Sequence, residues 1–131
     1  KNNGIHLIAF DTPDESKMSE IMIATNNTEA SAKAAAKMFD AVDYNGKIAV
    51  LVHNSVKKTG QERYNAITAE LAEKYADKDL RFVDVVYLAQ DARSEKQILD
   101  ELLEKHPDLE GIICTDLVTT EMVIDYWEKI C

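Results

Sequence analysis

Side chains that donate or accept hydrogen bonds gather in five segments that follow apolar, strand-like runs. These segments are 11–15, 26–27, 53–63, 89–93 and 116–120. They consist mainly of Asp, Asn, Thr, Gln and Arg, and they contain hardly any glycine. A loop that cradles phosphate through backbone amides needs glycines. The pattern therefore predicts a site that holds its ligand through side-chain hydrogen bonds.

The motifs of common catalytic and cofactor sites are absent from the sequence. There is no Gly-x-Gly-x-x-Gly, and Gly46-Lys47 continues into Ile48 rather than into a phosphate loop. No His-x-x-His, Cys-x-x-Cys or His-Glu-x-x-His spacing suits zinc, and no Gly-x-Ser-x-Gly presents a nucleophile. We therefore expect no cofactor, no metal site and no enzymatic activity.

The elements that must position these segments alternate along the chain. Apolar runs over 5–10, 21–25, 47–53, 80–88 and 109–115 predict strands. Helical spacing follows Asn26 and is expected again from Thr59-x-x-Glu62, from Ser94-x-x-Gln97 and over 119–130. The Asn-Gly pair at 45–46 is expected to break the chain before the third strand.

This alternation predicts an α/β fold in three layers, with a mostly parallel sheet that has helices on both faces. Ligands of such sheets bind outside the carboxyl ends of the strands. The five polar segments lie at those ends.

The composition of the chain limits the kinds of partner it can bind. The chain has 131 residues, enough for one domain, with 24 acidic against 15 basic residues and a net charge of -9. Such a surface repels phosphate backbones, so we expect no direct contact with nucleic acid. The longest apolar runs are much shorter than the roughly 20 residues of a membrane-spanning helix.

Four segments, in order, resemble one family across nearly the whole chain. They are Ile8-Ala9-Phe10-Asp11-Thr12, then Ala24-Thr25-Asn26-Asn27-x-Glu29-Ala30, then Gly46–Leu51 with Thr59–Arg63, and His106–Asp116. Together they resemble signatures of type I periplasmic binding proteins of the ribose/galactose type. These sugar binders share their fold with the effector domains of lac-repressor-type regulators.

The resemblance also implies a domain division. Family members have two lobes around a sugar-binding cleft. Residues 1–11 are similar to a strand that leads into a crossing between the lobes, and residues 12–131 to most of the second, C-terminal lobe. We therefore expect an incomplete lobe that carries one wall of the cleft, and an exposed lobe edge that favours self-association.

The resemblance carries ligand contacts to five positions. Asp11 matches a carboxylate that accepts sugar hydroxyls, with a turn before Pro13 as an equal alternative. Thr12 stands where ribose binders have arginine, and Gln90 where they have a stacking aromatic, so ribose itself is disfavoured. Asp116 stands where many members have asparagine, and a helix-capping role suits it equally well.

Arg63 matches an arginine whose planar guanidinium donates two hydrogen bonds to vicinal hydroxyls. We expect it in the first turn of its helix, where a cation opposes the macrodipole at a cost of about 0.3–1 kcal/mol. A residue kept despite that cost favours a ligand contact.

The function that the resemblance implies is capture of a sugar or polyol without catalysis, for ABC-type transport or chemosensing. The expected partners are a transporter permease or a sensor kinase, in a periplasmic, extracellular or membrane-anchored setting. The alternative is the inducer-binding domain of a cytoplasmic transcriptional regulator. A flavodoxin-like or response-regulator-like enzyme is a third possibility, which tight FMN binding or phosphorylation of a strand-end aspartate would reveal.

Overall fold

The computed structural model describes residues 6–11 and 18–130, except for the side chain of Gln90. Strands and helices alternate, as the periodicity predicts. The elements are β1 (Ile8–Phe10), β2 (Ile21–Ile23), α1 (Asn27–Ala41), β3 (Asn45–Val52), α2 (Lys58–Lys74), β4 (Asp79–Tyr87), the short 3₁₀ helix η1 (Leu88–Gln90), α3 (Glu95–Lys105), β5 (Leu109–Cys114) and α4 (Leu117–Ile130).

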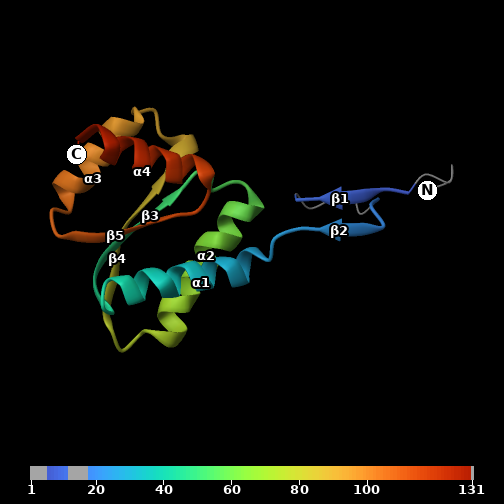
Figure 1. Cartoon of the computed structure of the whole chain (residues 1–131), viewed down its shortest axis with the longest axis horizontal. Helices are drawn as coiled ribbons and strands as arrows, with labels where there is room; N and C mark the ends of the chain where they lie inside the picture. Colours follow the sequence, from blue (N-terminus) through green and yellow to red (C-terminus); the bar gives the residue numbers. More distant parts are fainter. Residues whose placement is uncertain (1–5, 12–17, 131) are drawn as a thin grey trace.

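The body of the molecule is a three-layer α/β unit, which confirms the predicted fold class. Its sheet has the parallel order β4-β3-β5. Helices α1 and α2 cover one face and α3 and α4 the other (Figure 1). The central strand β3 is buried on both sides. Ile48 and Val50 pack with the α1/α2 layer, while Ala49 and Leu51 pack with the α3/α4 layer. A continuous apolar run is what a strand covered on both faces requires.

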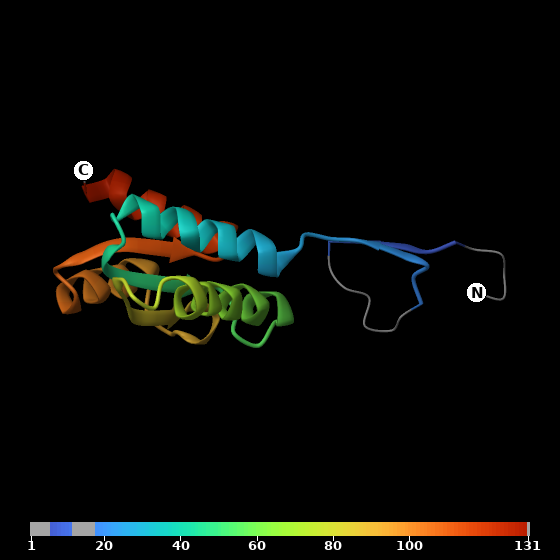
Figure 2. The same ribbon diagram turned by 90° about the horizontal axis from the view of Figure 1, so that it is seen from below.

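Strands β1 and β2 form a separate two-stranded parallel sheet, in which Ile8 pairs with Ile21. This pair projects from the body as an arm (Figure 2). The carboxyl ends of both strands point toward the body (Figure 1). The predicted boundary between residues 11 and 12 stays a prediction, but β2 pairs with β1 and not with the strands of the body.

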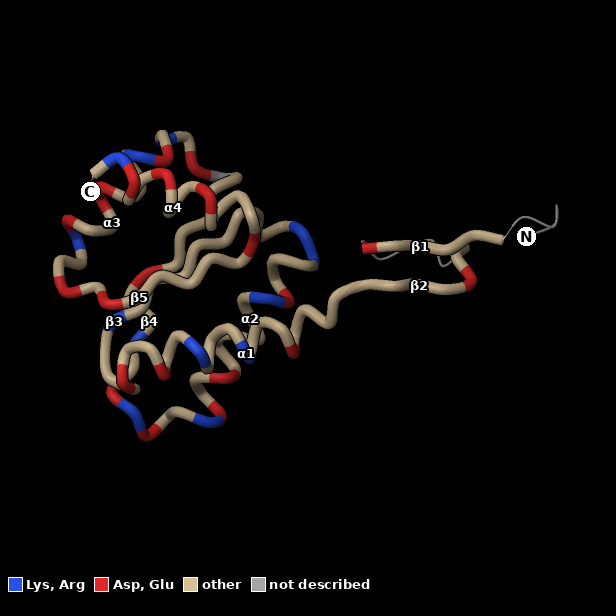
Figure 3. Tube along the Cα trace, in the orientation of Figure 1, with Lys and Arg blue, Asp and Glu red and all other residues tan. Residues whose placement is uncertain are grey.

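The arm exposes its apolar side chains on both sides. Phe10 is 78% exposed, and Ile8, Ile21 and Ile23 are each more than half exposed. Charged residues are concentrated on the body and are sparse along β1 and β2 (Figure 3). A two-stranded sheet is marginally stable alone, so this surface is suited to further packing.

The helix starts show where local pattern was sufficient. Asn26 caps α1 by accepting a hydrogen bond from the backbone N–H of Glu29, as predicted. Ser94 forms a reciprocal capping box with Gln97, also as predicted. The box expected at Thr59 and Glu62 is wrong, because α2 begins at Lys58 with no side-chain cap.

Two other boundaries differ from the prediction. The turn before β3 lies at Asp43 and Tyr44, which adopt positive φ angles of 52° and 57°, and Asn45 and Gly46 already belong to β3. Helix α4 begins at Leu117 rather than at residue 119. Within residues 6–11 and 18–130, no helix combines the length and apolar character needed to span a bilayer.

Candidate functional site

The Arg63 guanidinium is fixed by two segments that are remote in sequence. Its Nε donates to Oδ1 of Asn27 at 3.0 Å, and its Nη1 donates to the carbonyl oxygen of Thr115 at 2.7 Å. Asn27 opens α1, and Thr115 directly follows β5. All three residues are half-buried. The side chain is thus held where α1 begins and β5 ends, at the predicted edge of the sheet.

The predicted place of Arg63 within its helix is wrong. Helix α2 begins at Lys58, so Arg63 lies beyond the first turn, and the macrodipole acts mainly within that turn. The dipole argument for a ligand role therefore does not apply. The candidate role of Arg63 rests instead on its hydrogen bonds to Asn27 and Thr115, which hold the guanidinium at the edge of the sheet.

Asn27 belongs to the predicted polar segment 26–27, but its contact with Arg63 was not expected from the sequence. Only Asn26 caps α1, whereas Asn27 binds Arg63 through Oδ1 and Glu62 through Nδ2, at 3.2 Å. Glu62 also lies 3.8 Å from the Nζ of Lys58. The signal in the sequence was a pair of adjacent asparagines, which does not reveal which of them turns toward α2.

Asp116 has the capping role that was one of its two predicted alternatives. Its Oδ1 accepts hydrogen bonds from the backbone N–H of Thr119 at 3.0 Å and from the Thr119 hydroxyl at 3.1 Å. Its other oxygen, Oδ2, has a long 3.5 Å contact to the Thr115 hydroxyl. The carboxylate thus lies beside the segment that holds Arg63, and a ligand contact through Oδ2 stays a prediction.

The other predicted contacts are only partly described. Asp11 is exposed at the end of β1, with a positive φ of 72°, and its backbone N–H donates to the carbonyl of Ile23 at 2.8 Å. Thr12 lies outside the described residues. Gln90 ends η1, and its side chain is likewise outside the description. Their ligand contacts stay predictions.

His53 follows β3 and has a buried ring nitrogen, Nδ1, without a hydrogen-bond partner in the described part of the chain. Its carbonyl accepts from the backbone N–H of Ala89 at 2.7 Å, which joins the loop after β3 to η1. A buried polar atom without a partner costs about 1–3 kcal/mol. The imidazole is therefore an additional hydrogen-bonding group at the carboxyl edge of the sheet.

Cys114 ends β5, near Arg63, and is half-buried. Burial raises the pKa of its thiol, against a smaller opposing effect of the Thr119 and Thr120 hydroxyls. A thiol with a raised pKa is a poor nucleophile at neutral pH. The site therefore offers hydrogen-bond donors and acceptors rather than an activated nucleophile.

A cavity of about 220 Å³ lies beside the guanidinium, between the starts of α1 and α2 and the end of β5. Arg63, Asn27 and Thr115 line it together with Thr25 and Cys114. Among residues 6–11 and 18–130, no three His, Cys, Asp or Glu side chains are grouped so as to hold a metal ion. The lining thus offers hydrogen-bond donors and acceptors to a polar ligand.

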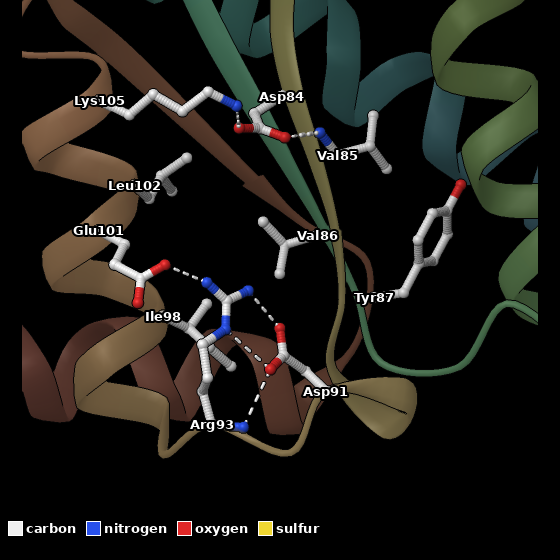
Figure 4. A pocket seen from close by; sticks show the side chains of 10 residues that line it. All are labelled: Asp84, Val85, Val86, Tyr87, Asp91, Arg93, Ile98, Glu101, Leu102 and Lys105. Carbon is white, nitrogen blue, oxygen red and sulfur yellow. Dashed lines mark hydrogen bonds and ion pairs between the residues drawn. The ribbon is translucent and has the colours of Figure 1, made fainter.

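A larger groove, of about 390 Å³, lies between β4 and α3 (Figure 4). Its charged groups are already satisfied by one another. Arg93 binds Asp91 through both carboxylate oxygens and reaches Glu101, while Lys105 donates to Asp84 at 2.8 Å. Asp91 and Arg93 belong to the predicted polar segment 89–93, but none of the five predicted ligand contacts is among the lining residues. We therefore place the candidate site at Arg63, despite the smaller cavity there.

Three solved structures with the same fold are described as sugar-binding or solute-binding proteins. AraP, an arabinose-binding protein from Geobacillus stearothermophilus, has a TM-score of 0.85 and 26% identity over 98% of this chain and 43% of its own. A sugar-binding ABC transporter protein from Bacillus halodurans has a TM-score of 0.84 and 25% identity over 96% of this chain and 42% of its own. An ABC transporter solute-binding protein from Burkholderia graminis, in complex with D-arabinose, has a TM-score of 0.79 and 25% identity, and covers 94% of this chain and 42% of its own.

The chain thus spans less than half the length of these structures. A comparison with curated protein sequences finds no significant match. A family model described as a periplasmic binding protein domain matches residues 1–130. The chain therefore belongs to the periplasmic binding protein domain family.

Proposed function

We propose that this chain supplies one wall of a sugar-binding cleft in a solute-binding protein that serves ABC-type transport, and that it binds its ligand without catalysis. The single observation that carries the proposal is the Arg63 guanidinium, held at the carboxyl edge of the body sheet between Asn27 and the Thr115 carbonyl. The similarity to AraP and to sugar-binding ABC transporter proteins supports a sugar as the ligand class.

Recognition follows from the donors and acceptors at this edge. Arg63 is the candidate donor to two neighbouring hydroxyls, while Oδ2 of Asp116 and the ring of His53 lie on adjacent strand ends as further partners. Asp11, Thr12 and Gln90 complete the proposed set. A buried hydroxyl that finds no partner costs about 1–3 kcal/mol, so such a set selects by the positions of the ligand's hydroxyls.

The proposed setting is the periplasm or the cell exterior, because the matching family is described as a periplasmic binding protein domain and a similar structure as a sugar-binding ABC transporter protein. A permease is the proposed partner, and a sensor kinase is the alternative for a chemosensing role. The inducer-binding domain of a regulator stays the competing prediction. The residues before Lys1 in the complete protein distinguish these, because a signal peptide supports uptake and a basic helical DNA-binding head supports regulation.

Calorimetric titration of the complete protein with arabinose, xylose, ribose, galactose, glucose and fructose tests the function. We expect one or more of these sugars to bind. Arg63→Ala is expected to weaken that binding at least about tenfold, or about 1.4 kcal/mol. Arg81→Ala is the matched control, because Arg81 is exposed near the amino end of β4 and, among the described residues, pairs with Asp79 alone. No binding by the unmodified protein, or equal affinity in Arg63→Ala, would refute the proposal.

A further inference from the structure

The Arg63 side chain is joined to its surroundings by a chain of polar contacts. It runs from Lys58 to Glu62, from Glu62 to the amide of Asn27, from Asn27 to Nε of Arg63, and from Nη1 of Arg63 to the Thr115 carbonyl. These contacts join α2, the start of α1 and the end of β5. The arginine is therefore fixed from two sides and does not extend freely into solvent.

The two contacts leave most of the guanidinium available. A guanidinium carries one N–H on Nε and two on each Nη. Asn27 takes the Nε hydrogen and Thr115 one hydrogen of Nη1, and Nη2 has no partner in the described part of the chain. Three N–H groups therefore remain, one on Nη1 and two on Nη2, and these can donate to neighbouring hydroxyl oxygens.

The orientation of the Asn27 amide is itself fixed. Its Nδ2 donates to a carboxylate oxygen of Glu62, so Oδ1 must be the atom that faces Arg63. A carboxylate can accept from Nδ2 but cannot donate to Oδ1, which excludes the flipped amide. Glu62 thus selects the acceptor that holds the arginine.

We propose that Asn27 is a positioning residue that holds the Nε–H of Arg63, so that the remaining N–H groups of Nη1 and Nη2 are presented to neighbouring hydroxyls of the ligand. This inference rests on the proposed function for its ligand class. Asn27 also directly follows the segment 24–26 that joins the arm to the body. The donors of Arg63 are therefore fixed relative to the point where the arm joins the body. Asn27 thereby determines how closely these donors align with the ligand's hydroxyls.

The first test needs no ligand. In the complete protein, the Nε–H of Arg63 is expected to give a sharp, slowly exchanging resonance in ¹⁵N NMR spectra, assigned by its loss in Arg63→Lys. Asn27→Ala is expected to broaden it or speed its exchange at least about tenfold. Asn26→Ala is the matched control, because it removes an adjacent asparagine that caps α1 without contacting Arg63. An Nε–H that is unchanged by Asn27→Ala overturns the positioning role, whatever the protein binds.

The second test measures affinity for the sugar that binds most tightly in the calorimetric panel. Asn27→Ala is expected to weaken binding about tenfold, and Asn26→Ala to leave it within about twofold. If Asn27 acts through Arg63, Asn27→Ala adds no further loss in the Arg63→Ala background, since coupled residues are not additive. Full additivity would overturn the inference.

A conservative exchange separates positioning from a general structural role. Asn27→Asp alone places a second carboxylate beside that of Glu62, where Nδ2 of Asn27 now donates to the Glu62 carboxylate at 3.2 Å. The double variant Asn27→Asp with Glu62→Gln restores both hydrogen bonds. Nε of Arg63 still donates to residue 27, and only the bond between residues 27 and 62 has its donor and acceptor exchanged. We expect it to recover affinity to within about threefold of the unmodified protein. If it stays as weak as Asn27→Ala while folding normally, positioning by hydrogen bonding is refuted. If the unmodified protein binds no sugar, the proposed function fails, and the NMR result still decides the role of Asn27.

Discussion

Substitution of Gly60 by alanine sets two opposing effects against each other in α2. Alanine is the better helix former, and the exchange is worth up to about 1 kcal/mol in a helix interior. A Cβ added at Gly60, however, would lie 2.2 Å from the backbone carbonyl oxygen of Asn54 and 3.6 Å from Cγ1 of Val52. The first contact is with backbone, so no side-chain rotation relieves it.

The loop that carries Asn54 is also held in place. Oδ1 of Asn54 accepts from the backbone N–H of Val56 at 2.8 Å and of Lys57 at 3.3 Å. Relieving the clash requires a shift of this loop by about 1 Å, and overpacking of this kind costs about 1–3 kcal/mol. We therefore expect Gly60→Ala to destabilise the protein by about 1–2 kcal/mol, which lowers Tm by roughly 5 °C in a domain of this size.

Thermal and urea unfolding followed by circular dichroism measure this difference. Gln61→Ala is a control for helix propensity, because Gln61 is exposed on the same turn and its side chain donates a hydrogen bond to the Ser55 carbonyl. We expect the control to change stability by less than about 0.5 kcal/mol. A Gly60→Ala variant that is as stable as the unmodified protein, or more so, would show that helix propensity prevails and that the loop yields easily.

Four further results follow from the structure. Phe39→Ala should cost about 3–5 kcal/mol in urea unfolding, since Phe39 is fully buried with its ring 5.1 Å from that of Tyr75; a loss below about 1 kcal/mol would contradict this. Arg93 lowers the pKa of Asp91 from 3.8 to about 2, so this carboxylate stabilises the fold above pH 4 and the gain is lost as the pH falls toward 2. Asp91→Asn should flatten unfolding stability in that window, and an unchanged acid slope would refute the pairing. Burial raises the pKa of Cys114, so iodoacetamide should alkylate it more slowly at pH 7 in the folded than in the unfolded chain; equal rates would exclude this. The exposed apolar arm predicts self-association in sedimentation velocity that Phe10→Lys reduces, and a strict monomer at high concentration would count against it.

Local pattern predicts the body of the fold well because its signals act over a few residues. The apolar run in β3 requires cover on both faces, and the sheet places it at the centre. The start of α2 was misplaced because the Asn54 side chain organises the preceding turn. That loop brings Lys57 to the N-cap position. The Thr-x-x-Glu pattern two residues later does not reveal this start.

The arm illustrates a second limit. The periodicity predicts strands over 5–10 and 21–25, and strands form at Ile8–Phe10 and Ile21–Ile23. Their separation from the body sheet could not be read from the sequence, because strand pairing depends on contacts made elsewhere in the fold. The similarity of the arm and body together to AraP, over 98% of the chain, supports this arrangement.

Arg63 shows that the physical reason for singling out a residue in the sequence can differ from what holds it in the fold. Arg63 was identified by resemblance and by a dipole cost that the structure removes, whereas its fixed position comes from partners 36 and 52 residues away. A pattern read over a short stretch of sequence cannot reveal contacts between residues so far apart. Asn26 and Asn27 have the same side chain, yet one faces the amides of its own helix and the next, turned by one helical step, faces α2. Two adjacent asparagines at a helix start therefore take different roles because their side chains point in different directions. The packing of α2 against α1 determines which of the two contacts Arg63.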